Sequence, residues 1–105
     1  MATQEPSKKP RDVMRVYTQN IWQLCGKWED WRSALIAGIR KLDPDLVAFA
    51  ESIKTNEYDQ TRDLLGSEYN LAYSKKRDSN GMGISIGSRW PIKEVDEVEM
   101  EIPLR

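Results

Sequence analysis

The chain has 105 residues, of which 39% are hydrophobic and 31% charged, with a formal net charge of -1. This composition is typical of a soluble globular domain, and the low net charge argues against a general nucleic-acid binder. One cysteine and no histidine exclude an internal disulfide, a thiolate zinc site and a Cys-His nucleophile.

Residues 1–12 are polar and contain two prolines, which predicts a flexible N-terminal tail ahead of a domain over 13–105. The tail has no apolar core of the kind that a signal peptide needs. No stretch of the sequence approaches the roughly 18 apolar residues of a membrane span. We therefore expect a cytoplasmic protein without a membrane span.

The first half of the domain predicts a strand, a helix and a second strand. Alternation over Val13–Asn20 indicates a strand, and the apolar run Leu46–Ala50 indicates one covered on both faces, as in a parallel sheet. Between them a helix over Glu29–Leu42 is predicted, ended by Pro44. Its expected buried stripe is Trp31, Leu35, Ile39 and Leu42. Gly38 within this helix suggests close packing against a neighbour.

The second half predicts a shorter helix followed by a hairpin. The helix is expected over Glu57–Leu65, capped by Asn56 and stopped by a left-handed Gly66. Two short strands, Tyr69–Tyr73 and Met82–Gly87, follow on either side of a polar turn. The last run, 92–102, fits either a helix or a strand, and its flanking prolines and β-branched residues favour a strand.

Polar side chains follow the two strands that are expected to be parallel. Asn20 ends the first strand and Glu51 follows the second. Ligands gather at the carboxyl ends of parallel strands, and a carboxylate beside an amide oxygen suits a hard cation such as Mg²⁺. The alternative is that Glu51 is an exposed loop residue and Asn20 a turn former.

Other residues carry weaker signals. The basic runs Lys8–Arg11 and Lys75–Arg77 are expected to be solvated surface. Trp22 either packs or lines a substrate cleft. Arg89 and Trp90 are expected to pack at a strand end and form a turn, with substrate contact as the alternative.

Three segments, in order, resemble the endonuclease/exonuclease/phosphatase superfamily, which includes deoxyribonuclease-like and sphingomyelinase-like enzymes. Arg15–Asn20 resembles the family's opening strand, which typically ends in Thr-x-Asn. Asp43-Pro44-Asp45-Leu46-Val47 followed by Glu51 is similar to the family's segment of Asp-Pro-Asp, an apolar run and Gln-Glu. Gly81–Ile92 is similar to a later strand that commonly ends in Ser-Arg-aromatic-Pro-Ile.

The resemblance implies an α/β fold with a mixed sheet and two helices, forming the N-terminal half of a four-layer α-β-β-α sandwich. It also implies that Glu51 is a catalytic metal ligand and that Asn20 helps to organise the metal, Mg²⁺ or Mn²⁺, and the phosphate. The implied activity is hydrolysis of a phosphoric ester, with nucleic acid among the candidate substrates.

Two departures limit that expectation. Ala50 stands where the family usually has Gln. The family's later Asp-x-Asn pair, histidines and Ser-Asp-His triplet have no counterpart, which predicts that the domain is truncated and inactive alone. Two alternatives stay open: a non-catalytic binding module that kept only the half-sheet, and a nucleic-acid binder that uses the basic runs.

Overall fold

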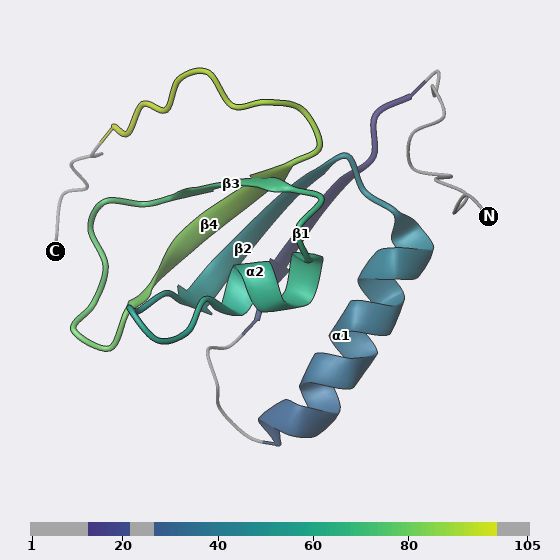
Figure 1. The fold of residues 1–105 in the computed structure, drawn as a ribbon, viewed down its shortest axis with the longest axis horizontal. Helices are drawn as coiled ribbons and strands as arrows, with labels where there is room; N and C mark the ends of the chain where they lie inside the picture. Colours follow the sequence, from purple (N-terminus) through teal and green to yellow (C-terminus); the bar gives the residue numbers. More distant parts are fainter. Residues whose placement is uncertain (1–12, 22–26, 99–105) are drawn as a thin grey trace, which may run out of the picture.

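The computed structural model describes residues 13–21 and 27–98. The predicted tail over 1–12, the loop residues Trp22 and Cys25, and the last residues from 99 onward lie outside this description. The elements run β1 (Val16–Asn20), α1 (Trp28–Leu42), β2 (Leu46–Ile53), α2 (Gln60–Leu65), β3 (Asn70–Tyr73) and β4 (Met82–Ser88) (Figure 1). The predicted α/β class, with a mixed sheet and two helices, is confirmed.

The four described strands form one sheet in the order β1-β2-β4-β3. β1 and β2 pair in parallel, with Val16 opposite Leu46 and Asn20 opposite Ala50. β4 pairs antiparallel with both β2 and β3. The predicted βαβ unit and the predicted hairpin are therefore both present, and β2 lies inside the sheet with a parallel and an antiparallel neighbour.

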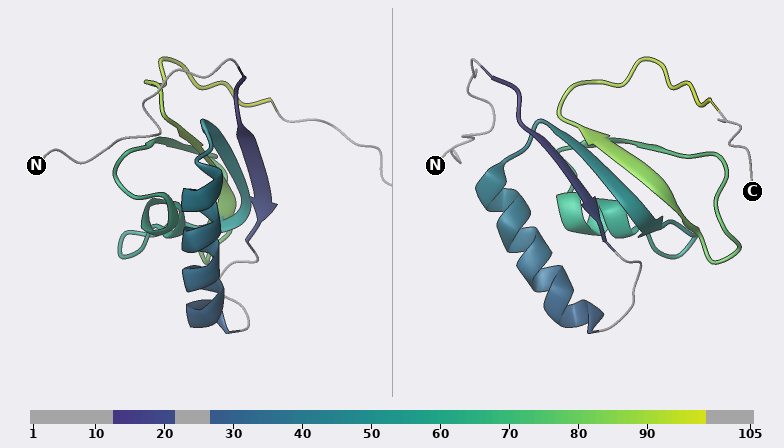
Figure 2. Two further views of the ribbon diagram at one scale, coloured as in Figure 1. Left: turned by 90° about the vertical axis from the view of Figure 1, so that its right-hand side faces the viewer. Right: turned by 180° about the vertical axis from the view of Figure 1, so that it is seen from behind.

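Both helices lie on the same side of the sheet (Figure 2). Side chains on that side form the core together with the helices: Ile21, Ile39, Val47, Phe49, Leu64, Leu65 and Tyr69. The ring of Tyr17 meets that of Phe49 edge to face, with 6.2 Å between the ring centroids. Burial of this one face supplies the main driving force for folding.

The other face of the sheet is open among the described residues. Val16 is 61% exposed, Ile84 54% and Ile86 45%, and the sheet register places all three on that face. The prediction that β2 is covered on both faces is therefore wrong for the described part of the chain, because only alternate residues of its first half are buried. The four-layer arrangement stays a prediction.

Helix α1 begins at Trp28 and presents a different stripe from the one predicted. Trp31 is 53% exposed and Leu42 49% exposed, so neither is in the core. Ile39 is buried, and the residues packed beside it are Trp28, Leu35 and Ile36. Trp28, and not Trp31, is the tryptophan of α1 that packs against the core. It lies seven residues before Leu35, which places both side chains on the same face of the helix. A Cβ at Gly38 would meet nothing within 4 Å, so the predicted close packing there is also wrong.

Helix α2 begins three residues later than predicted. The chain turns at Thr55, whose Oγ1 accepts the N–H groups of Glu57 and Tyr58 at 3.2 and 3.1 Å. Asp59, not Asn56, is the N-cap: its Oδ1 accepts the N–H of Arg62 at 3.1 Å. Gly66 ends the helix with φ 81° and ψ -171°, a positive φ that suits glycine but is not the left-handed helical conformation expected.

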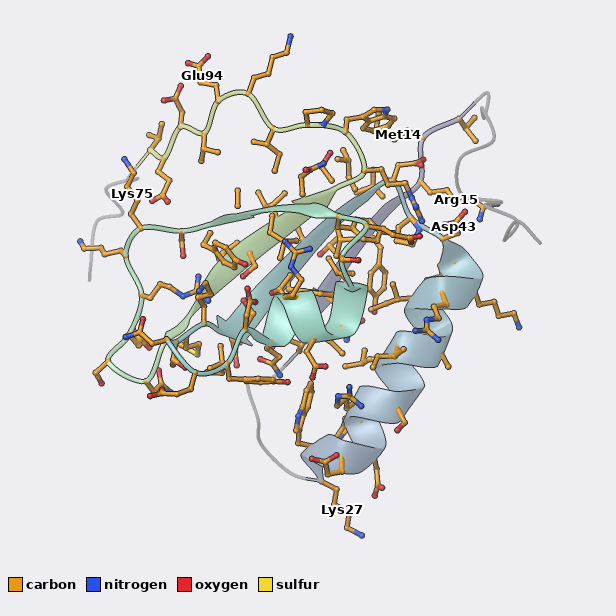
Figure 3. All side chains as sticks on the ribbon, viewed as in Figure 1. Met14, Arg15, Lys27, Asp43, Lys75 and Glu94 are labelled. Carbon is orange, nitrogen blue, oxygen red and sulfur yellow. The ribbon has the colours of Figure 1, made fainter. Side chains whose placement is uncertain are left out.

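After β4 the chain is irregular from 91 to 98, so the described part of the predicted last strand is wrong. This segment runs back across the molecule toward the loop after β3, where Figure 3 labels Glu94 and Lys75. The Oε1 atom of Glu97 accepts the backbone N–H of Lys75 at 2.6 Å. In the described ranges, no helix is long and apolar enough to cross a membrane.

Candidate metal site at the ends of β1 and β2

The structure brings together the two residues that the sequence singled out. Asn20 ends β1 opposite Ala50 of the parallel strand β2. The prediction that Glu51 follows β2 is wrong, because the strand runs on to Ile53 and Glu51 lies within it, one residue past the end of its pairing with β1. The Nδ2 atom of Asn20 donates a hydrogen bond to the Oε2 atom of Glu51 at 2.9 Å. An amide and a carboxylate therefore meet at the carboxyl end of a parallel strand pair, the position where α/β sheets bind ligands.

Glu51 reaches this position because β2 contains a β-bulge. Phe49 pairs with Ser85 and Ser52 pairs with Gly83, so two residues of β2, Ala50 and Glu51, lie opposite Ile84 alone. Phe49 and Ser52 are both fully buried although they are three residues apart. In a regular strand such residues face opposite sides of the sheet, so the bulge shifts the alternation by one position.

The backbone of Glu51 is in a conformation that L-residues rarely adopt. Its φ is 55°, and it shares positive φ with only one other described non-glycine residue, Asp43. Left-handed geometry costs about 1 to 2 kcal/mol for a residue with a Cβ. Such residues concentrate at functional sites, where the surrounding structure holds them in place. The bulge therefore gives a second reason, independent of the sequence motif, to single out Glu51.

Polar side chains that the sequence did not indicate hold the strand after the bulge. The buried Oγ of Ser52 lies 2.7 Å from Oγ of Ser85 and donates to the carbonyl of Gly83 at 3.1 Å. Gln60, fully buried at the start of α2, accepts the N–H of Ile53 on Oε1 at 2.9 Å. Nothing in the local sequence distinguishes Ser52 or Gln60 from surface residues, because their burial depends on how α2 packs on the sheet.

The opposite end of β2 is a structural junction. Arg89 forms an ion pair with Asp43 and donates from Nε to the carbonyl of Pro44 at 3.0 Å. The same carbonyl accepts the hydroxyl of Tyr69 at 2.7 Å, and the guanidinium of Arg89 lies 4.8 Å from the Tyr69 ring centroid. Arg89 therefore packs at a strand end, as predicted, whereas the same prediction is wrong for Trp90, whose side chain is 49% exposed.

The same junction fixes the start of the sheet. The Oδ2 atom of Asp45 accepts the backbone N–H of Arg15 at 2.8 Å, and Nη1 of Arg15 donates to the carbonyl of Leu42 at 2.6 Å. Figure 3 shows Arg15 and Asp43 at the corner where β1 begins and α1 ends. The Asp-Pro-Asp segment thus ties α1 to the first two strands, and it sets the register that brings Asn20 beside Ala50.

The second basic run divides into two kinds of residue. Lys75 and Lys76 are exposed, as predicted for solvated surface, whereas Arg77 is half-buried. Partial burial lowers the pKa of Arg77, and its side chain bonds to backbone carbonyls on both central strands. The expectation that all three residues are solvated is wrong for Arg77, because backbone carbonyl groups of distant residues, instead of water, accept its hydrogen bonds.

The tyrosine beside this loop is held in its neutral form. Tyr73 donates its hydroxyl to Asp59, and burial together with that hydrogen bond raises the pKa of Tyr73 to about 12. A tyrosine is already protonated at neutral pH, and the raised pKa keeps the Tyr73 phenol a hydrogen-bond donor to Asp59 into alkaline pH.

The donor set at the site fits part of a magnesium site. In the described part of the chain, no three Asp, Glu, Cys or His side chains gather where they could hold a metal ion. Mg²⁺, however, usually binds one or two carboxylates and completes its octahedron with waters and substrate phosphate oxygens. One hydrogen bond from Asn20 uses only part of the acceptor capacity of the Glu51 carboxylate, which has about four lone-pair positions.

Comparison of this chain with protein-family models, with curated proteins and with solved structures found no match.

Proposed function

We propose that this chain contributes Glu51, as a metal ligand, to the divalent-metal site of a phosphoric-ester hydrolase. The observation that carries the proposal is the 2.9 Å hydrogen bond from Asn20 Nδ2 to Glu51 Oε2, made where the parallel pairing of β1 and β2 ends. The bulge supports it, because the register shift between Phe49 and Ser52 removes Glu51 from the helix-covered position that regular alternation would give it.

The two residues have different roles in this proposal. Glu51 would hold Mg²⁺ or Mn²⁺ through its carboxylate, and Asn20 would fix the orientation of that carboxylate through Nδ2. A divalent ion bound there would polarise the phosphoryl group of an ester and stabilise the leaving oxygen. The chain has no histidine, so its own residues lack the family's usual partner for activating water. We therefore expect the 105-residue chain to bind the metal ion without turning over a phosphate ester.

Titration of the isotope-labelled chain with Mn²⁺, followed by NMR, tests the proposal. The paramagnetic ion should broaden the signals of Asn20 and Glu51 before those of any other residue, and excess Mg²⁺ should reverse the broadening. Glu51→Gln should abolish this selective broadening, since it removes the charge and keeps the shape.

Glu68→Gln is the matched control, because Glu68 is an exposed glutamate in the turn after α2 and its substitution removes the same charge. Broadening that spreads evenly over the acidic residues, or that is equal in Glu51→Gln and Glu68→Gln, would contradict the proposal. That outcome would favour the non-catalytic binding module, which needs no divalent ion.

A further inference from the structure

Arg77, in the loop between β3 and β4, lies against the bulge that carries Glu51. Its Nη2 atom donates to the carbonyl of Ser52 at 2.7 Å, and its Nη1 atom donates to the carbonyl of Ile84 at 3.0 Å. Ser52 directly follows Glu51 in β2, and Ile84 is the β4 residue opposite the bulge. One side chain therefore links the two central strands at the point where their pairing is irregular.

A third bond fixes the orientation of the guanidinium. Its Nε atom donates to the carbonyl of Gly81 at 2.8 Å, and the same carbonyl accepts the N–H of Lys54. Arginine presents several donors in a rigid planar fork, whereas the ammonium group of lysine is a single point at the end of a flexible stem. Three carbonyls contacted from three nitrogens therefore require arginine.

The strand opposite the bulge has no side chain where the guanidinium lies. A Cβ built on Gly83 would come within 2.8 Å of Nη1 of Arg77 and 2.7 Å of Oγ of Ser74. On the other side, Cζ of Arg77 lies 5.8 Å from the centroid of the Tyr73 ring. Gly83 thus leaves the space, and Tyr73 provides an aromatic face, for a partly buried arginine.

We propose that Arg77 is the positioning residue that holds Glu51 in its left-handed conformation, within hydrogen-bonding distance of Asn20. By bonding both strands next to the bulge, Arg77 prevents Ser52 from sliding into the regular register, which would turn Glu51 toward the helix-covered face. The consequence for metal binding rests on the proposed function, whereas the consequence for the backbone of Glu51 does not.

NMR on the full 105-residue chain tests this directly. The Cα and Cβ shifts of Glu51 report its φ, and the side-chain amide signals of Asn20 report the bond to Glu51. Arg77→Met should move the Glu51 shifts toward extended values and the Asn20 amide toward its solvent-exposed position. Arg77→Met should also weaken Mn²⁺ binding at Glu51 by roughly tenfold, the usual effect of losing an outer partner of a metal ligand.

Three further variants separate positioning from charge and from general stability. Arg77→Lys keeps the charge but not the fork, so it should resemble Arg77→Met at Glu51. Gly83→Ala keeps Arg77 but takes the space that the guanidinium occupies, so it should give the same shifts. Arg40→Met removes an exposed charge from α1 and should leave Glu51 and Asn20 unchanged.

The outcomes distinguish this inference from the proposed function. If Arg77→Met and Gly83→Ala change only signals of the β3–β4 loop, Arg77 braces the hairpin alone and the inference is overturned. If the Glu51 and Asn20 signals change as expected but the unsubstituted chain binds no Mn²⁺, the positioning role is supported and the metal function fails. Should Arg77→Met fail to fold, Arg77→Lys and Gly83→Ala decide the question by the same signals.

Discussion

The two ends of the pairing between β1 and β2 invite comparison, because an acidic residue with positive φ lies near each: Asp43 at 51° and Glu51 at 55°. At Asp43 the conformation has a structural explanation. The residue follows the last turn of α1, its N–H donates to the carbonyl of Ile39 at 2.8 Å, and its carboxylate pairs with Arg89. A left-handed residue is a common way for a helix to end.

At Glu51 the same conformation ends no helix. It lies within a strand, in a bulge, and its carboxylate accepts a hydrogen bond from the neutral amide of Asn20. The same backbone conformation therefore occurs in two settings. Asp43 caps a helix and is paired with an arginine, whereas the carboxylate of Glu51 lies where two parallel strands stop pairing, a position at which α/β sheets commonly bind ligands. The positive φ of Asp43 is explained by the end of a helix, whereas that of Glu51 is not, and backbone strain without such an explanation is the kind that points to a functional site.

Substitution of Arg89, the partner of Asp43, should reduce the stability of the fold more than any other change considered below. Arg89→Met removes the ion pair with Asp43, the bond to the carbonyl of Pro44 and the contact with the Tyr69 ring. We expect a loss of about 2 to 3 kcal/mol in the free energy of unfolding, measured by urea denaturation. Arg40→Met, at an exposed site, should change it by less than about 0.5 kcal/mol. Equal effects of the two substitutions would show that the junction at the start of β2 contributes nothing special.

Replacement by glycine should change stability by a smaller amount, and in opposite directions at Glu51 and Asp43. Glu51→Gly removes the steric penalty of positive φ, so we expect stability to rise by about 0.5 to 1 kcal/mol while selective Mn²⁺ binding is lost. Asp43→Gly relieves the same penalty but leaves Arg89 without its partner, so we expect a net loss of about 1 kcal/mol. Urea denaturation measures both values.

Glu51→Ala is the control for this pair, because it removes the same carboxylate and keeps the Cβ. The difference in stability between Glu51→Gly and Glu51→Ala isolates the backbone contribution from that of the side chain. If Glu51→Gly is no more stable than Glu51→Ala, the positive φ of Glu51 stores no strain, and the comparison with Asp43 loses its basis.

Asp63 is a carboxylate away from both Asp43 and Glu51, and we expect the loss of its ion pair to change stability least. Asp63 accepts two bonds of 2.8 Å from Arg32 and one of 2.6 Å from the hydroxyl of Tyr58. The bond from Arg32 lowers the pKa of Asp63, with help from Tyr58 and against the opposing effect of burial. Because the folded pKa is lowered, the stabilisation is complete above the unfolded value of about 3.9 and is lost as pH falls through the folded value.

Titration of the Asp63 carboxyl carbon by NMR should therefore give a midpoint below about 3.9. Arg32→Met should raise that midpoint and reduce stability less than either Arg89→Met or Asp43→Gly does, since the Arg32 pair is partly exposed. A midpoint that Arg32→Met leaves unchanged would show that the pair does not persist in solution.

Local sequence patterns were sufficient to predict most of the elements and the two candidate residues. Alternation, an apolar run and Pro44 define β1, β2 and the end of α1, because each depends on neighbours within a few residues. The same signals indicated that Asn20 and Glu51 follow parallel strands. Since adjacent parallel strands end at the same edge, their proximity could be expected, and the bond of 2.9 Å agrees with it.

Which faces are buried, and the bulge that carries Glu51, depend on contacts between residues far apart in the sequence. Trp28 and Trp31 have the same side chain, so either could fill the core position. The packing of α1 on the sheet places Trp28 there and leaves Trp31 exposed. The bulge at Glu51 arises from pairing with β4, more than thirty residues later, and Arg77 gains its role from carbonyls of two strands. Such long-range hydrogen bonds leave no periodic trace in the sequence, because the groups that satisfy them are brought together only by folding.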